Sequence, residues 1–130
     1  MPMTSLTYSK LPMVARGFAD CVVGTMTWFD LPEGLSVTNR DFTNLALLSI
    51  AVECAAFLDA VETLHPDGKA GVRRAIKAHN LGWHFFLARQ RTGIGYANFR
   101  LGDFGRGLDS LALRFPPIRV EIGDGKINFL

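Results

Sequence analysis

The sequence predicts a mainly α-helical α+β fold, a compact bundle of three main helices and a short fourth helix followed by a C-terminal β-hairpin. Long segments repeat apolar residues at three- and four-residue spacing, and Pro- and Gly-containing stretches separate them. Near the C-terminus, apolar and polar residues alternate on both sides of Gly-Asp-Gly at 123–125. With 130 residues, of which 48% are hydrophobic and 20% charged, the chain fits a single domain, 1–130, with a real core.

The first helix is expected from Ser9 to about Phe29, with Pro12 tolerated in its opening turn. Small residues recur along one face at spacings of four and three, which would let another helix approach closely. They are Gly17, Cys21 and Gly24. The stretch 30–36 (DLPEGLS) holds a proline and a glycine and is expected to be a loop.

The second helix is expected from Asn39 to Leu64. Thr38 and Asp41 resemble a capping box that starts it, and His-Pro-Asp-Gly at 65–68 ends it. One side is apolar and consists of Leu47, Ile50, Cys54, Phe57, Leu58 and Val61. Glu53 lies at the margin of that side, where a carboxylate either answers a buried arginine or acts as a tuned acid-base group.

The third helix is expected from Lys69 to about Thr92. If it is continuous, its polar residues share a narrow arc and form a basic stripe, while aromatic and aliphatic residues fill both flanks. The stripe consists of Arg73, Lys77, Asn80, His84 and Arg91.

The remaining segments are shorter. Five glycines in 93–107 predict an irregular loop, and a helix from Leu108 to Phe115 is expected to stop at two prolines. The two strands of the hairpin are expected at 118–122 and 126–130.

Charge is divided unevenly along the chain and indicates the kind of partner. Residues 1–68 carry three basic and eight acidic residues, a net charge of −5, whereas residues 69–130 carry eleven and four, a net charge of +7. This predicts an acidic protein surface or a nucleic acid as partner; alternatively, the halves neutralise each other within one fold or across a homodimer. The expected partner-binding residues are Arg73, Lys77, Asn80, His84, Arg91, Tyr96, Arg100 and Arg106.

The glycine-rich segment offers two interpretations. Tyr96, Phe99 or Phe104 could stack on bases while the neighbouring arginines meet phosphates. Alternatively, these aromatic rings fill the core and the arginines face water.

No targeting signal or membrane span is evident. The apolar stretch 11–29 contains Arg16 and Asp20, and the stretch 45–58 contains Glu53, so both are expected to be buried helices. We therefore expect a cytoplasmic protein with no membrane partner.

No cofactor or metal is expected. Cys21 and Cys54 lack a CxxC spacing and are predicted to be buried free thiols. Gly-Ile-Gly at 93–95 is followed by Asn98 where a dinucleotide-binding turn requires glycine, and the segment follows a predicted helix instead of a strand.

Residues 74–79 read RAIKAH, an arginine with a histidine five positions on. This spacing resembles the RxxxxH signature of the HEPN superfamily, small helical-bundle proteins that include ribonucleases in which the Arg and His act on the RNA phosphodiester. The resemblance covers six residues and implies a metal-independent ribonuclease with Arg74 and His79 as catalytic residues.

Three functions follow from these observations. The first is a small non-enzymatic interaction protein, a regulator or inhibitor that uses the basic stripe and the glycine-rich loop. The second is the HEPN-like ribonuclease. The third is a small-molecule-binding helical domain in which aromatic residues line a pocket between helices.

Overall fold

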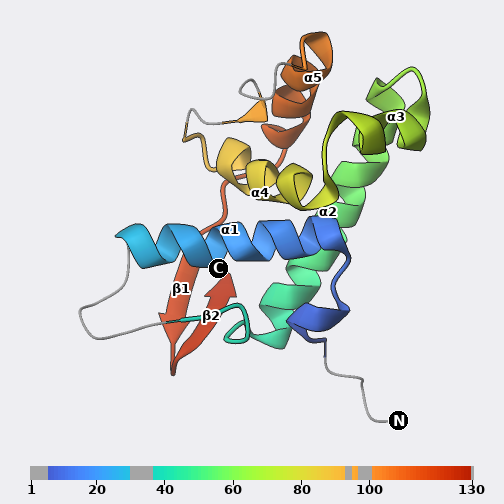
Figure 1. Cartoon of the computed structure of the whole chain (residues 1–130). Coiled ribbons are helices and arrows are strands. Elements are labelled where there is room, and N and C mark those ends of the chain that lie inside the picture. The colour runs from blue at the N-terminus through green and yellow to red at the C-terminus, as the bar shows by residue number, and fades with distance from the viewer. Residues whose placement is uncertain (1–5, 30–36, 93–94, 97–100, 130) are drawn as a thin grey trace.

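A computed structural model describes residues 6–29, 37–92, 95–96 and 101–129, with only the backbone for 27–29. The chain is mainly helical and ends in a two-stranded antiparallel hairpin, which confirms the predicted fold class (Figure 1). In chain order the elements are η1 (Tyr8–Lys10), α1 (Met13–Phe29), α2 (Asn44–Leu64), α3 (Gly68–Ala75), α4 (Ala78–Arg89), α5 (Asp103–Ala112), β1 (Val120–Gly123) and β2 (Lys126–Phe129). The expected loop 30–36 lies outside the described residues.

The closest helix pair is α1 with α4, which run side by side across the middle of Figure 1. A Cβ atom at Gly17 would lie 2.0 Å from the carbonyl oxygen of His79, and one at Gly82 would lie 1.7 Å from that of Val14. The backbones therefore touch at two glycines. The predicted strip of small residues on the first helix is confirmed, although α1 begins at Met13, after the short turn η1, and not at Ser9.

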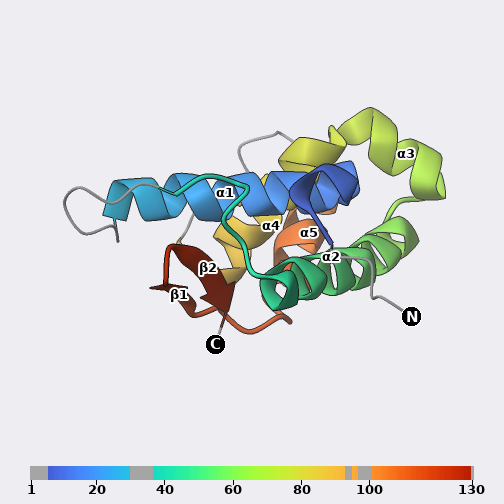
Figure 2. The same cartoon turned by 90° about the horizontal axis from the view of Figure 1, so that it is seen from below.

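The second helix begins later than predicted, at Asn44, where the Thr43 hydroxyl accepts a hydrogen bond from the Ala46 N–H. Asp41 accepts the Thr38 N–H at 2.7 Å, as a capping box would, but this pair closes a turn and does not start the helix, so the predicted start at Asn39 is wrong. Ile127 of β2 bonds to the backbone of residues 41 and 43, and this pairing keeps the segment extended beside the hairpin. Figure 2 shows the start of α2 next to the hairpin.

The third helix is not continuous, which corrects the prediction of one helix from Lys69 to Thr92. Ile76 and Lys77 adopt extended backbone conformations and separate α3 from α4. The break has a packing cause: α3 contacts α2 whereas α4 lies along α1, and Ile76 itself is buried between them. One straight helix cannot make both contacts.

The helix predicted from Leu108 to Phe115 is also displaced. It forms α5, which begins at Asp103, within the glycine-rich segment, and ends at Ala112. Gly105 packs against Leu101 and the Tyr96 carbonyl, and Gly107 packs against Leu64, so the glycines allow close contact within a helix. Tertiary packing here overrides the low helix propensity of glycine.

The hairpin forms where the sequence predicts it. Its strands pair Val120 with Phe129 and Gly123 with Lys126, and the strands are shorter than expected. Asp124 and Gly125 have φ angles of 53° and 74°, as a two-residue type I′ turn requires.

An aromatic cluster occupies the centre of the core. The Phe57 and Phe85 rings stack with centroids 4.0 Å apart, and Phe18 and Tyr96 pack around them. These residues come from α1, α2, α4 and the segment before α5, so the cluster joins most of the helices.

Candidate functional site

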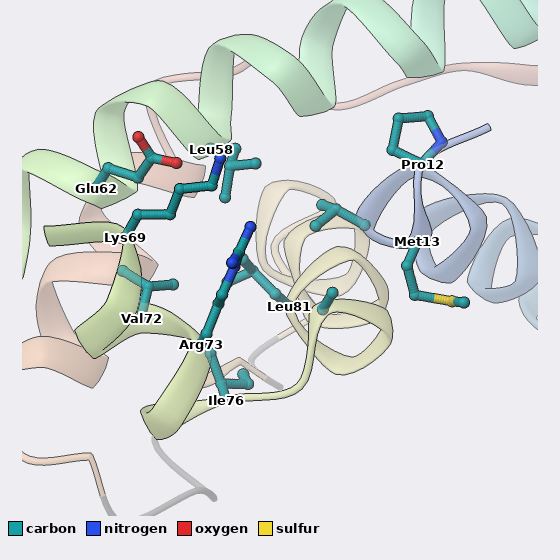
Figure 3. A pocket seen from close by; sticks show the side chains of 11 residues that line it. Pro12, Met13, Leu58, Glu62, Lys69, Val72, Arg73, Ile76 and Leu81 are labelled. Atoms are coloured by element: carbon teal, nitrogen blue, oxygen red, sulfur yellow. The ribbon is translucent and has the colours of Figure 1, made fainter.

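A pocket with a volume of about 180 Å³ lies where α1, α2, α3 and α4 meet (Figure 3). Its floor is apolar because buried side chains from three helices and the α3–α4 connection converge there. The lining residues are Pro12, Met13, Val14, Leu58, Glu62, Lys69, Val72, Arg73, Ile76, Ala78 and Leu81. The break between α3 and α4 creates this pocket, since it turns Ile76 inward and folds α3 over the end of α2.

The rim of the pocket is basic. Lys69 and Arg73 are four residues apart on α3, so both side chains project from one face of the helix toward the opening (Figure 3). Glu62 of α2 is the one acidic side chain lining the pocket. Within the described part of the chain, neither Lys69 nor Arg73 forms an ion pair. Lys77 is a third exposed cation, and in the sequence it lies between Ile76 and Ala78, which both line the pocket.

The volume limits what the pocket can hold. A cavity of about 150 Å³ is enough for a benzene molecule, whereas pockets for drug-sized ligands run from about 300 to 1,000 Å³. The space of about 180 Å³ therefore suits one aliphatic or aromatic side chain. An anionic group beside that side chain would meet Lys69 and Arg73.

The structure divides the expected basic stripe. Arg73 lies at the pocket rim and Lys77 is exposed beside it, whereas Arg91 follows the opposite end of α4. The Arg91 guanidinium donates to backbone carbonyls just beyond α5, so it caps that helix. Asn80 and His84 are half-buried, and His84 Nδ1 lies 3.1 Å from the Asn80 carbonyl oxygen. The five residues do not form one face, because the helix that would align them is broken.

The glycine-rich segment also differs from the expectation. Tyr96 is fully buried and its hydroxyl donates to the Leu81 carbonyl, so its role is in the core and not in stacking on a partner. Burial raises its pKa well above the usual value. Arg106 is exposed and pairs with Asp103. Phe104 packs against the core, and Arg100 and Phe99 lie outside the described residues.

Glu53 forms an ion pair with a buried arginine, Arg89, which was one of its two predicted roles. Arg89 is 1% exposed, and its guanidinium donates to Glu53 Oε2 at 2.9 Å and to the Pro116 carbonyl at 2.8 Å. The rings of Phe85 and Phe115 flank it, with centroids 5.2 and 5.3 Å from Cζ. This arginine is therefore a structural residue.

Arg74 and His79, the residues implied by the HEPN resemblance, are held by different carboxylates. Arg74 donates to Asp67 at 2.9 Å, whereas His79 Nε2 lies 2.8 Å from Asp20 Oδ2 of α1. Asp20 also accepts the hydroxyl of Tyr8, whose pKa is raised by burial and by this carboxylate. The His79–Asp20 contact ties α4 to α1, so the two side chains belong to separate networks.

The two cysteines are free and buried, as predicted. Burial raises the pKa of the Cys21 thiol to about 12 and raises that of Cys54 as well, so neither is a thiolate near neutral pH. In the ranges that the structure describes, no three His, Cys, Asp or Glu side chains are grouped closely enough to hold a metal ion.

Comparison with family models, with curated proteins and with solved structures finds no match for this chain. Sequence reasoning identified Arg73 but missed Lys69, Leu58 and Met13. The four-residue spacing of Lys69 and Arg73 was visible, but the pocket beneath them depends on a helix break that the sequence pattern does not indicate.

Proposed function

We propose that the protein is a non-enzymatic interaction module, of the regulatory or inhibitor kind, that binds an acidic segment of a partner protein. An apolar side chain of that segment would occupy the pocket while flanking carboxylates meet Lys69 and Arg73. The observation that carries this proposal is the combination of an apolar floor with two cations that form no ion pair in the described structure. Anchor residues in such pockets supply most of the affinity of many protein interfaces.

The pocket favours a protein segment over nucleic acid. Phosphate recognition needs a row of cations, and single-stranded binding adds exposed aromatic rings. Here Arg74 and Arg106 pair with acids, Arg89 is buried, and Tyr96 is in the core. The charge imbalance of the sequence is thus partly neutralised within the fold, whereas Lys69 and Arg73 at the pocket rim form no ion pair with a described residue.

Within this proposal each residue has a definite role. Val72, Ile76 and Leu81 form the apolar floor that excludes water from the anchor. Arg73 can bind a carboxylate through two parallel N–H groups, whereas Lys69 acts as a point charge. Glu62 disfavours partners that place an acid next to it, so it helps to fix the orientation of the segment.

Binding of short peptides tests the proposal. A library of labelled peptides with one Leu, Phe or Trp among Asp and Glu residues is screened by fluorescence anisotropy. We expect binding that weakens with salt and by about tenfold or more when the anchor is replaced by alanine. Arg73→Glu should remove it, and Ala78→Phe should block it by filling the opening of the pocket.

Arg119→Glu is the matched control, because Arg119 is exposed and the charge change is the same. Its binding should equal that of the unmodified protein. Peptide binding that is insensitive to Arg73→Glu and Ala78→Phe would contradict the proposal. So would a single-stranded RNA of equal charge that binds more tightly than any peptide.

A further inference from the structure

α2 carries an exposed apolar stripe that faces away from the core. Leu45, Leu48 and Val52 are 73%, 53% and 59% exposed, and Ala55 and Ala56 continue the stripe toward Asp59. Their spacing of three and four residues places them within an arc of about 100° on the helix. None of these residues lines the pocket, so this surface is distinct from the proposed binding site.

The composition of α2 argues against a membrane surface as the occupant. By length and composition α2 could cross a membrane, yet its other side packs on α1, α3, α5 and β2. Helices that lie on a bilayer carry Lys and Arg at the edges of the apolar face. α2 has no basic residue and three acidic ones, which anionic lipids would repel.

We propose that the stripe is the interface of a homodimer, in which α2 of one protomer packs antiparallel against α2 of its partner around a two-fold axis near Val52. The stripe has large side chains in its first half and alanines in its second. An antiparallel pair centred on Val52 places Leu48 of one protomer over Ala56 of the partner subunit, so large residues fill the space above small ones. The arrangement is self-complementary, as a two-fold interface requires.

Charge supports the same arrangement. No charged side chain lies on the stripe between Leu45 and Ala56, so nothing is repelled across the axis. The pairing also brings Asp59 close to the first turn of the partner's α2. A carboxylate there interacts favourably with the exposed N–H groups at a helix N-terminus.

The size of this seam sets the expected strength. One helix packed against its copy is at the lower end of specific interfaces, about 1,200 Å² in total, so we expect a micromolar dimer.

Sedimentation velocity over about 1 to 100 µM should show the mass rising from 14.3 kDa toward twice that value. Leu48→Glu should weaken the dimer at least about tenfold, because it buries two carboxylates. The matched control is Leu113→Glu, at a leucine that is 47% exposed but lies after α5, and it should leave the dimer unchanged.

Cross-linking tests the position of the axis. Val52→Cys should form a disulfide-linked dimer on mild oxidation, because the two copies of residue 52 meet at the axis. Leu113→Cys should not, and the native thiols are buried. A monomer at all these concentrations, or a dimer that Leu48→Glu leaves intact, overturns the proposal. A monomer that sediments with anionic vesicles also overturns it and identifies a membrane surface as the occupant.

Discussion

Arg89 and Arg73 lie on consecutive helices and have the same side chain, yet their surroundings are opposite. Arg89 is enclosed by Glu53, the Pro116 carbonyl and three aromatic rings, and almost none of it reaches solvent. Arg73 is exposed at the rim of an apolar pocket and forms no ion pair with any described residue. Desolvation explains the difference: a buried guanidinium has to be saturated with partners, whereas an exposed one remains hydrated and available.

The comparison shows which arginines of a basic sequence can serve binding. Of the cations in the second half of the chain, those at positions 74, 89 and 106 have acidic partners within the fold. A net charge of +7 therefore overstates the charge that a partner would meet. Only the environment of each side chain distinguishes a structural arginine from one that can bind.

The largest effect on the free energy of unfolding is expected from removing Glu53, the carboxylate that pairs with Arg89. Glu53→Gln keeps the size of the side chain but leaves a buried guanidinium without its anion. Because Glu53 is partly exposed, we expect a loss of about 2 to 4 kcal/mol in the free energy of unfolding, measured by urea denaturation. Glu121→Gln, at an exposed strand position, should change it by less than about 0.5 kcal/mol. Equal effects of the two variants would show that Arg89 does not depend on Glu53.

The second largest effect is expected at the contact between α1 and α4, where the two backbones touch. Gly17→Ala puts a methyl group 2.0 Å from the His79 carbonyl oxygen, so the helices must separate. The gain in helix propensity is smaller than the overpacking cost, and we expect a net loss of about 1 to 3 kcal/mol. Thermal unfolding followed by circular dichroism measures it. Gly123→Ala, which meets no atom within 4 Å, is the control, and a loss at Gly123 as large as at Gly17 would contradict the close contact.

Much of the fold follows from local patterns in the sequence. Asp124-Gly125 predicts the hairpin because the turn needs positive φ at both residues, and Gly17 with Gly24 predicts a close helix contact. The helix starts were less predictable. Thr43 caps α2, but the segment before it is held extended by Ile127, more than eighty residues away along the chain. No local pattern contains that information.

The candidate site was predictable only in part, for the same reason. A helical pattern runs through Ile76 and Lys77, yet the chain is extended there because α3 and α4 pack on different partners. The break removes the expected alignment of Arg73 with Arg91 and creates the pocket beneath Arg73. Sequence periodicity describes one helix at a time, whereas the pocket depends on the placement of four.

The smallest effect on stability is expected at the pocket rim. Arg73→Ala removes a hydrated charge that forms no ion pair with a described residue. The free energy of unfolding should therefore change by less than about 0.5 kcal/mol. Binding of an acidic anchor peptide should nevertheless weaken by about tenfold, because the carboxylate loses its partner. Arg89→Ala should give the reverse: a large loss of stability, and peptide affinity retained in whatever fraction stays folded. If Arg73→Ala destabilises the protein as much as Arg89→Ala does, the rim is part of the structural network, and the contrast between the two arginines fails.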